Sequence, residues 1–400
     1  MADGRLRARL TLTRRAIGGG IGATALSLGV SRMATAQTPR ASIRFADGAS
    51  DTGWIGFAFG NEAVMLTVHV NGRPVQALLD NGASQTALDF RLANALGLGH
   101  GDGVLVEGIS GPAGAAVLQP ILVQIGALSI ALPTPIVLDL QKSGVTQPML
   151  LGREVFEHLI VDMDLPNRRM AFRQPGTFTP SPDMMTAPLV PQPSRARLTP
   201  IVLEGQAPIL AMFDLGSEEA LAVSAAYAAD QKLGAGRRAA QWVSGGVEGI
   251  EPIRITSLAD VRFGGALLKD VPVSVVEHWN RPESAVNIGM PLLSRFRLIT
   301  DFGRDRMWLR VDDRAVRSPF DRNRSGLACL PKNGAFLVVF VAPGSVGAAA
   351  GLHAGDVITA INGAPATPAN RAWGSAPAGT TVTLTLGDGN RRVLTLADYF

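Results

Sequence analysis

The sequence predicts a mainly β protein made of two duplicated lobes, followed by a small α+β domain. Short apolar runs bounded by Gly, Pro or Asn recur along the chain, as in Ala63 to Val70 and Val271 to Val276, and such runs are typical of strands. Two stretches 134 positions apart repeat each other, and a unit of different character begins near Arg322. A repeat of this kind indicates two lobes related by a pseudo-twofold axis.

Each copy of the repeat centres on an aspartate that follows apolar residues and precedes a glycine by one position. The copies are residues 74–84, with Asp80, and residues 208–218, with Asp214. The repeat continues downstream at an offset of 137, where 150–156 answers 287–293 and 164–170 answers 301–307. A pseudo-twofold axis would therefore bring one carboxylate from each lobe to a common site.

Two carboxylates in one site have a chemistry suited to amide hydrolysis. Carboxylates about 3 Å apart cannot both ionise, so they share one proton, and any pKa belongs to the pair. One oxygen then acts as a base towards water while its neighbour acts as an acid towards the peptide carbonyl. Asp80 and Asp214 are the predicted pair, and glycine two positions on leaves space beneath each carboxylate.

At these residues the chain resembles the retropepsin-like and pepsin-like aspartic peptidases. Their signature of two apolar residues, Asp, Thr or Ser, Gly and a small residue is matched by Leu78 to Ala83 and by Met212 to Ser217. Their second signature, two apolar residues and a glycine before a short helix, is matched by 150–154 and more loosely by 287–289. The resemblance covers about residues 60–312 and implies a two-lobed acid-protease fold.

The resemblance also implies roles for individual residues. Asp80 and Asp214 would be catalytic, with the dyad supported by Asn81, Gly82, Leu215, Gly216 and Ser217. Between its two signatures each lobe of the family has a glycine-rich flap that closes over substrate. The candidate flap residues are Gly108, Ile109, Ser110 and Gly111 in the first copy and Gly245 and Gly246 in the second. The alternative is that these are ordinary hairpin glycines.

Two positions depart from the family pattern. The family has a hydroxyl residue after each catalytic aspartate, and the two hydroxyls form hydrogen bonds across the pseudo-dyad. This chain has Asn81 and Leu215 there, so Asn81 can still donate a hydrogen bond while Leu215 can neither donate nor accept one. Two interpretations follow. The chain is an aspartic endopeptidase, or it is an impaired pseudopeptidase that binds peptides.

The C-terminal unit is similar to the bacterial PDZ domains of periplasmic proteases. Residues 341–352 lead into 355–363, which ends in an Asn-Gly turn, and the match is specific over about 25 residues. The resemblance implies a peptide-binding loop at Ser325, Gly326 and Leu327 and a C-terminal peptide as the ligand, and the chain's own Asp398-Tyr399-Phe400 end is one candidate. The groove-lining helix is expected to be short, and a packing module without a ligand is the alternative.

The sequence pattern divides the chain into seven segments. A cluster of prolines marks the linker between the lobes. The predicted segments are an export signal at 1–36, an N-terminal linker at 37–58, lobe 1 at 59–176, a Pro-rich linker at 177–196, lobe 2 at 197–312, a linker at 313–322 and a PDZ-like domain at 323–400.

The N-terminus predicts export. Thr13-Arg14-Arg15 precedes a short apolar run and the small-residue pattern Ala34-Thr35-Ala36, which resembles a cleavable twin-arginine signal. A periplasmic or otherwise exported protein without a transmembrane segment is expected after cleavage, and a membrane-anchored one if the signal stays uncleaved. The lone Cys329 permits no intramolecular disulfide.

The overall charge and the remaining polar residues limit the partners. The net charge is +4, but residues 1–36 hold six arginines against one aspartate, so the rest of the chain has a net charge of −1. No nucleic-acid partner, metal or cofactor is therefore expected, and the five histidines lack metal-ligand spacing. The expected partner is a peptide or protein substrate.

Three local features have simpler interpretations. The tripeptide Asp51-Thr52-Gly53 lacks a preceding apolar strand and is predicted to be a loop. Asp164 and Asp301 precede turns and are expected to serve hairpins. Ser217 to Leu233 is the clearest helix candidate, with acidic residues in its first turn.

Overall fold

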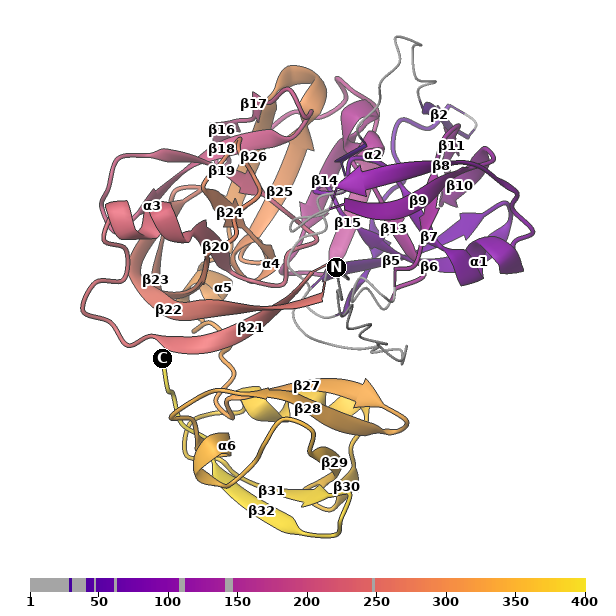
Figure 1. Ribbon diagram of the computed structural model, residues 1–400. Helices are drawn as coiled ribbons and strands as arrows, with labels where there is room; N and C mark the ends of the chain where they lie inside the picture. The colour runs from indigo at the N-terminus through magenta and orange to yellow at the C-terminus, as the bar shows by residue number, and fades with distance from the viewer. Residues whose placement is uncertain are drawn as a thin grey trace, which may run out of the picture.

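The structure is a computed structural model that describes residues 29–30, 41–46, 48–60, 63–107, 112–140, 147–246 and 249–400. These residues form two β lobes, a sheet to which both lobes contribute, and a separate C-terminal unit (Figure 1). The predicted mainly β, two-lobed architecture followed by a small domain is confirmed. In the predicted export signal only Gly29–Val30 is described, as a short strand.

Lobe 1 is built on a twelve-stranded sheet. Its strands are β1 Gly29–Val30, β2 Ser42–Phe45, β4 Ala58–Gly60, β5 Ala63–Val70, β6 Arg73–Leu79, β7 Ala87–Asp89, β8 His100–Glu107, β9 Pro112–Leu118, β10 Ile121–Ile125, β11 Leu128–Leu132, β12 Ile136–Leu138 and β13 Met149–Leu151. They lie in the order β1-β8-β9-β12-β7-β13-β6-β5-β10-β11-β2, with β4 paired to β5. Helices α1 Phe90–Ala95 and α2 Glu154–His158 follow β7 and β13.

Lobe 2 repeats this plan on an eight-stranded sheet. Its strands are β17 Val190–Pro191, β18 Arg197–Leu203, β19 Ile209–Phe213, β20 Leu221–Ser224, β21 Ala240–Gly246, β22 Gly249–Phe263, β23 Ala266–Val276 and β24 Val286–Ile288. They lie in the order β17-β18-β19-β24-β20-β23-β22-β21, and β18 also pairs with β22. Helices α3 Ala225–Asp230 and α4 Met290–Leu293 follow β20 and β24.

The two lobes share one unusual strand arrangement. In lobe 1, β13 lies parallel to β6 and antiparallel to β7. In lobe 2, β24 lies parallel to β19 and antiparallel to β20. Because β6 and β19 are the strands that end at the two repeated aspartates, each second signature lies directly beside its own aspartate.

A six-stranded sheet joins the lobes. Its strands are β3 Ile55–Gly56, β14 Ile160–Asp164, β15 Arg169–Arg173, β16 Met185–Pro188, β25 Phe296–Asp301 and β26 Arg306–Val311, in the order β16-β26-β25-β14-β15-β3. Strands β14 and β25 are antiparallel, with Asp162 opposite Ile299. These two positions differ by 299 − 162 = 137, the repeat offset, so this pair lies on the pseudo-twofold axis. The predicted linker 177–196 contains β16 and β17.

Buried charges hold this shared sheet together. Asp162 is fully buried and its Oδ2 lies 3.0 Å from Arg173 Nη2 and 2.8 Å from Arg297 Nη2. Arg173 also pairs with Asp51 at 2.7 Å, so Asp51-Thr52-Gly53 lies in a loop attached to this sheet and not at the dyad. Asp164 accepts a hydrogen bond from Asn167, in the turn between β14 and β15, as the hairpin interpretation predicted.

The predicted helix from Ser217 to Leu233 is wrong over most of its length. Leu221–Ser224 is strand β20, and only Ala225–Asp230 is helical. β20 is completely buried between β23 and β24, so sheet pairing outweighs helix propensity there. The Ser224 side chain accepts a hydrogen bond from Tyr227 N and begins the shorter helix.

The C-terminal unit is a small α+β domain. Its strands are β27 Leu327–Lys332, β28 Ala335–Val341, β29 Val357–Ile361, β30 Ala364–Pro365, β31 Thr381–Leu386 and β32 Arg391–Thr395, in the order β27-β28-β29-β31-β32 with β30 paired to β29. Helix α6 Val346–Ala349 and the 3-10 helix η2 Pro368–Ser375 complete it. Asn362 and Gly363 have φ of 52° and 82°, as the predicted Asn-Gly turn requires.

Two further short helices follow the strands of the shared sheet, and an apolar cluster joins lobe 2 to the C-terminal domain. η1 Phe302–Arg304 follows β25, and α5 Asp313–Arg317 leads to the C-terminal unit. Ile253 and Ile255 of lobe 2 form one buried cluster with Ala342 and with Tyr399 of the C-terminal tail. β27 and β28 are on the side of the domain that faces β21 and β22 (Figure 1).

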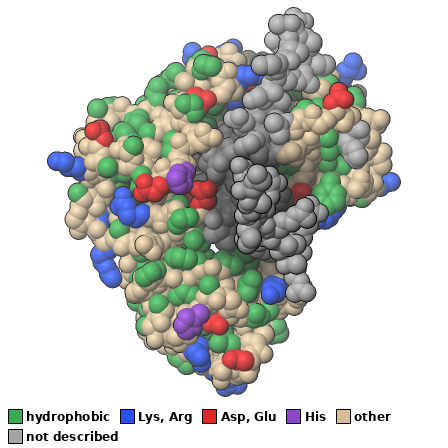
Figure 2. All heavy atoms as spheres, viewed as in Figure 1, with side chains coloured by type: hydrophobic (Ala, Val, Ile, Leu, Met, Phe, Trp, Pro, Cys, Tyr) green, Lys and Arg blue, Asp and Glu red, His purple; other side chains and the backbone are tan. Residues whose placement is uncertain are grey.

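The outer surface carries both charge signs. Acidic and basic side chains are interspersed over the visible face of lobe 2 and the C-terminal unit (Figure 2). No helix in the described part of the chain is long and apolar enough to cross a membrane.

Candidate active site

Asp80 and Asp214 occupy matching positions at the ends of β6 and β19. The Asp80 backbone N–H donates to Leu151 O at 3.0 Å, and the Asp214 N–H donates to Ile288 O at 2.8 Å. Asp80 Oδ1 accepts from Gly82 N at 2.7 Å and Asp214 Oδ1 accepts from Gly216 N at 2.9 Å. Both side chains are at most 1% exposed, so each carboxylate is fixed in a buried turn.

The two carboxylates face each other across the lobe interface. A Cβ atom added to Gly82 would lie 2.9 Å from both carboxylate oxygens of Asp214. A Cβ atom added to Gly216 would lie 2.7 Å from both oxygens of Asp80. Each glycine is therefore required because the aspartate of the other lobe passes over it, and the sequence-based reason given for these glycines is confirmed.

Among the described residues, Asn81 supplies two hydrogen bonds across the pseudo-dyad. Its Nδ2 donates to Phe213 O at 2.7 Å, and its Oδ1 accepts from Leu215 N at 2.8 Å. These are the backbone groups on either side of Asp214. Leu215 is fully buried in the apolar core and has no polar group in its side chain. Lobe 1 therefore contributes a polar side chain to this brace and lobe 2 does not. Ser217 contributes through its carbonyl, which accepts from Met290 N at 2.9 Å.

Arg153 holds the Asp80 loop through hydrogen bonds to its backbone carbonyls. Its Nε donates to Asn81 O at 3.1 Å and its Nη2 to Gly82 O at 3.1 Å, while Nη1 reaches Ser194 O at 2.8 Å. Arg153 is buried, and burial lowers its pKa. The matching position in lobe 2 is Met290, so this clamp exists in lobe 1 only. The sequence placed Arg153 in the second signature without giving it a role.

A second buried arginine, missed by the sequence analysis, contacts the dyad itself. Arg281 Nη1 lies 3.6 Å from Asp214 Oδ2 and 3.4 Å from Asn287 Oδ1, and the side chain is 7% exposed. Arg281 belongs to the loop between β23 and β24, where Trp279 Nε1 donates to Arg281 O at 3.1 Å. No motif precedes or follows this arginine, so its position could be found only from the folded chain.

The surroundings of the dyad differ in their effect on the two carboxyls. Burial raises the pKa of Asp80 to about 8, and the charge of Asp214 adds to that rise. Burial also raises the pKa of Asp214, but the Arg281 guanidinium opposes this rise more than any other neighbour. Because a cation beside Asp214 favours its ionised form, the shared proton is expected on Asp80.

Glu219 is a third buried carboxyl on the Asp214 loop. Its Oε1 accepts a hydrogen bond from Ser244 Oγ at 3.2 Å, and its Oε2 is buried without a hydrogen-bond partner among the described residues. Burial raises the pKa of Glu219 to about 7. The matching residue in lobe 1 is Gln85, so this acid has no counterpart and was not identified from the sequence.

The flap predictions are only partly covered by the structure. Gly108, Ile109, Ser110 and Gly111 lie outside the described residues, between β8 and β9. Gly245 and Gly246 lie at the end of β21, where Gly246 pairs with Gly249 of β22. The action of both candidate flaps on a substrate is still a prediction.

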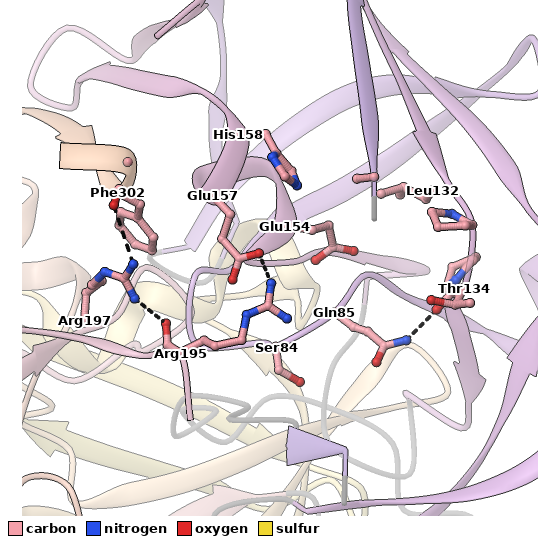
Figure 3. A pocket seen from close by; sticks show the side chains of 14 residues that line it. Ser84, Gln85, Leu132, Thr134, Glu154, Glu157, His158, Arg195, Arg197 and Phe302 are labelled. Carbon is pink, nitrogen blue, oxygen red and sulfur yellow. Dashed lines mark hydrogen bonds and ion pairs between the residues drawn. The ribbon is translucent and has the colours of Figure 1, made fainter. Parts of the chain in front are cut away.

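A cavity of about 980 Å³ lies beside the dyad loop, at the junction of the lobes. Figure 3 shows how its charged and polar side chains pair with one another. Gln85 Nε2 donates to Thr134 O, and the Arg195 guanidinium forms an ion pair with Glu157. Neither Asp80 nor Asp214 is among the described residues that line this cavity.

Two of the predicted peptide-binding residues, Ser325 and Gly326, lie directly before β27, and the third, Leu327, is its first residue. Ser325 is buried, and Gly326 has φ of 71°. The chain's own C-terminal tail does not lie in this loop. Tyr399 is 7% exposed and packs against lobe 2, and Phe400 O accepts from Arg322 Nη1 at 3.1 Å.

Comparison with known families agrees with this geometry. Residues 66–155 match the family model described as aspartyl protease, and residues 337–386 match the PDZ domain model. The chain thus contains a segment similar to aspartyl proteases, followed by a C-terminal segment similar to PDZ domains. The first match runs from β5 through the Asp80 signature into α2. No curated protein matches the chain.

No cluster of metal ligands accompanies the dyad. Among the described residues no group of three or more His, Cys, Asp or Glu side chains is placed to hold a metal ion. Cys329 is partly buried, and burial raises the pKa of its thiol to about 12.

Proposed function

We propose that the protein is an exported aspartic endopeptidase that hydrolyses peptide bonds with Asp80 and Asp214. The observation that carries this proposal is the reciprocal fit of the two loops, in which a side chain at either glycine would collide with the carboxylate of the other lobe. The Asn81 brace supports the proposal too, because one side chain supplies both a donor and an acceptor across the axis.

The proposed reaction assigns a different role to each carboxyl. Asp214, held ionised by Arg281, takes a proton from a water molecule as the water oxygen attacks the carbonyl carbon of the peptide bond. Asp80 gives its proton to the carbonyl oxygen, and a tetrahedral diol forms. Return of a proton to the amide nitrogen breaks the C–N bond and releases an amine and a carboxylic acid.

The substrate is expected to be an extended peptide held mainly through its backbone. The lobes provide strands on both sides of the dyad, and we propose that the hairpins β8-β9 and β21-β22 act as flaps. A binding protein without catalysis is the competing function. It is motivated by Leu215, which stands where the family has a hydroxyl residue.

Casein cleavage distinguishes the two functions. The purified chain without residues 1–36 is incubated with casein between pH 4 and 7.5, beside Asp80→Asn and Asp214→Asn. Cleavage that either substitution abolishes is the expected result. A folded chain that leaves casein intact over the whole range would favour the peptide-binding pseudopeptidase.

The exported location is tested separately. The residue pair Arg14-Arg15 and the small residues at 34–36 motivate it. In a bacterial host with a twin-arginine pathway, Arg14→Lys combined with Arg15→Lys should retain the chain in the cytoplasm, as measured by cell fractionation. An unchanged distribution would overturn the proposed route, and membrane-bound chain would indicate an uncleaved anchor.

A further inference from the structure

The carboxylate-binding loop of the PDZ domain is occupied by the chain's own side chains. Asn323 Oδ1 accepts hydrogen bonds from Ser325 N at 3.0 Å and from Gly326 N at 2.9 Å. The Leu327 N–H donates to Ser325 Oγ at 3.1 Å. All three backbone donors that would hold the terminal carboxylate of a peptide are therefore already paired.

Asn323 also makes the other contact that a bound terminal residue would make. Its Nδ2 donates to Leu327 O at 3.0 Å, at the first residue of β27. η2 closes the loop from the other side, because Arg324 N donates to Gly374 O at 2.7 Å. A carboxylate can reach the loop only after the Asn323 amide has left, and removing a buried partner from two N–H groups costs free energy.

Beyond this loop the groove between β27 and η2 is open. A cavity of about 360 Å³ is lined by Leu327, Phe336 and Trp373 of the PDZ domain and by Trp242 and Glu218 of lobe 2. β27 pairs with β28 on one side and has no second strand partner among the described residues. Such an edge strand can pair with an extended peptide along its free side.

The charges in the cavity do not favour a terminal carboxylate. Glu218 and Arg371 are the charged side chains among its described lining residues, one of each sign. The walls are otherwise mostly apolar, so the groove suits uncharged, apolar side chains on a peptide backbone.

The loop end of the groove lies against the catalytic lobe. The ring of Phe340, whose residue pairs with Ala328 of β27, contacts Trp242 of β21 edge-on at 5.9 Å between centroids. Glu218 lies four positions after Asp214 on the same loop. A bound peptide that continues past Asn323 therefore reaches the loop that carries Asp214.

From these contacts we infer that the PDZ groove binds an internal, extended apolar segment of a polypeptide, and not a free C-terminus. The segment pairs with β27 and continues past Asn323 towards the Asp214 loop. That this polypeptide is the substrate rests on the proposed function, while the binding mode does not.

Peptide arrays in two orientations test the inference. In one array, overlapping twelve-residue peptides of casein are attached to the support through their C-termini. In the other array the same peptides are inverted, so that their C-terminal carboxylates are free. The Asp80→Asn chain is used because it binds without cutting. We expect binding to C-terminally attached peptides, so that a free carboxylate is unnecessary. Binding only to free carboxylates, or to neither array, overturns the inference.

Two variants assign that binding to the groove. Ala372 is exposed and lines the cavity, so Ala372→Trp, added to the Asp80→Asn chain, fills the groove and should weaken binding about tenfold or more. Val393, 61% exposed on β32 at the opposite edge of the sheet, is the matched control, and Val393→Trp should leave binding unchanged. Equal binding by both variants would assign the peptides to the catalytic cleft and overturn the inference.

Asn323→Ala in the same Asp80→Asn chain tests the occupied loop directly. Removing the amide frees the N–H groups of Ser325 and Gly326, so binding of inverted peptides should increase about tenfold while attached peptides bind as before. No gain in a folded variant contradicts the role given to Asn323. Casein cleavage by the parent chain is measured independently, so groove binding without cleavage refutes only the proposed function.

Discussion

The side chain of Asn81 in lobe 1 holds the backbone N–H of Leu215 in lobe 2 at 2.8 Å, across 134 positions of sequence. Together with the bond from Asn81 Nδ2 to Phe213 O, this fixes the backbone on both sides of Asp214. The symmetric hydroxyl brace expected for the family is thus replaced by one amide that acts in both directions.

Asn81→Ala should impair both stability and turnover. It leaves Phe213 O and Leu215 N buried without their partner, and each lost partner costs about 1–3 kcal/mol. A small displacement of Asp214 should lower the rate of casein cleavage ~100-fold. Asn81→Thr, whose hydroxyl can donate and accept, should retain more activity than Asn81→Ala.

The control for Asn81 is Asn94→Ala on exposed α1, which should change neither quantity. Leu215→Thr buries a hydroxyl in the apolar core and should destabilise the chain without raising turnover. A large gain in turnover from Leu215→Thr would show that the single brace limits catalysis.

Arg281→Gln should shift the pH profile of cleavage upwards. The guanidinium favours the ionised dyad, so its removal raises the pH at which Asp214 loses its proton and the pH at which Asp80 loses the shared one. Both limbs of the kcat/KM profile should move to higher pH by about one unit. The control is the exposed Arg262→Gln, and equal profiles for the two variants would exclude an electrostatic role for Arg281.

Glu219→Gln should stabilise the chain at neutral pH. Burial raises the pKa of Glu219 from 4.5 to about 7, so the folded chain binds this proton more tightly than the unfolded chain. The folded chain therefore loses stability as the pH rises from 4.5 through 7, by about 3 kcal/mol for this group.

Urea unfolding at pH 4.5 and pH 7.5 measures this effect. The Gln variant should equal the parent chain at the lower pH and exceed it in unfolding free energy at the higher pH. Glu277→Gln, at an exposed position, should match the parent at both. A variant weakened equally at both pH values would show that Glu219 is needed for packing and not for its charge.

Tyr399 should tolerate loss of its hydroxyl but not of its ring. The ring is buried against Ile253 and Ile255, while the hydroxyl is buried without a hydrogen-bond partner among the described residues. Tyr399→Phe should therefore be neutral or stabilising, because it removes an unpaired polar group. Tyr399→Ala should cost about 3 kcal/mol by chemical denaturation. If Tyr399→Phe costs as much, the hydroxyl has a partner.

The sequence predicted the elements of the site that follow a repeating pattern. Asp80, Asp214 and their glycines could be found because the same spacing occurs twice. Each turn depends on neighbouring residues, an aspartate and the glycine two positions after it. The sequence could not place Arg281, because its contact with Asp214 depends on the path of a loop 67 positions away. Glu219 lies in the motif itself, but its raised pKa follows from burial by the folded lobe.

The fold shows the same division between local and long-range information. The predicted strand Ala63 to Val70 has the bounds of β5, because its apolar pattern is complete in itself. The predicted strand Val271 to Val276 forms only the second part of β23, which begins at Ala266. The shared sheet was not predicted, because β14 and β25 pair over more than 130 positions. The false helix after Ser217 arose because its acidic first turn outweighed the apolar run that pairs with β23.

Because the brace comes from one lobe, the two lobes do not contribute equally to the alignment of the dyad. Two copies of lobe 1 facing each other would present two asparagine amides across their axis, whereas two copies of lobe 2 would present two leucines and no polar bond. Lobe 2 therefore depends on lobe 1 to align its aspartate. In this chain, lobe 1 supplies the polar brace and lobe 2 supplies the backbone groups that the brace holds.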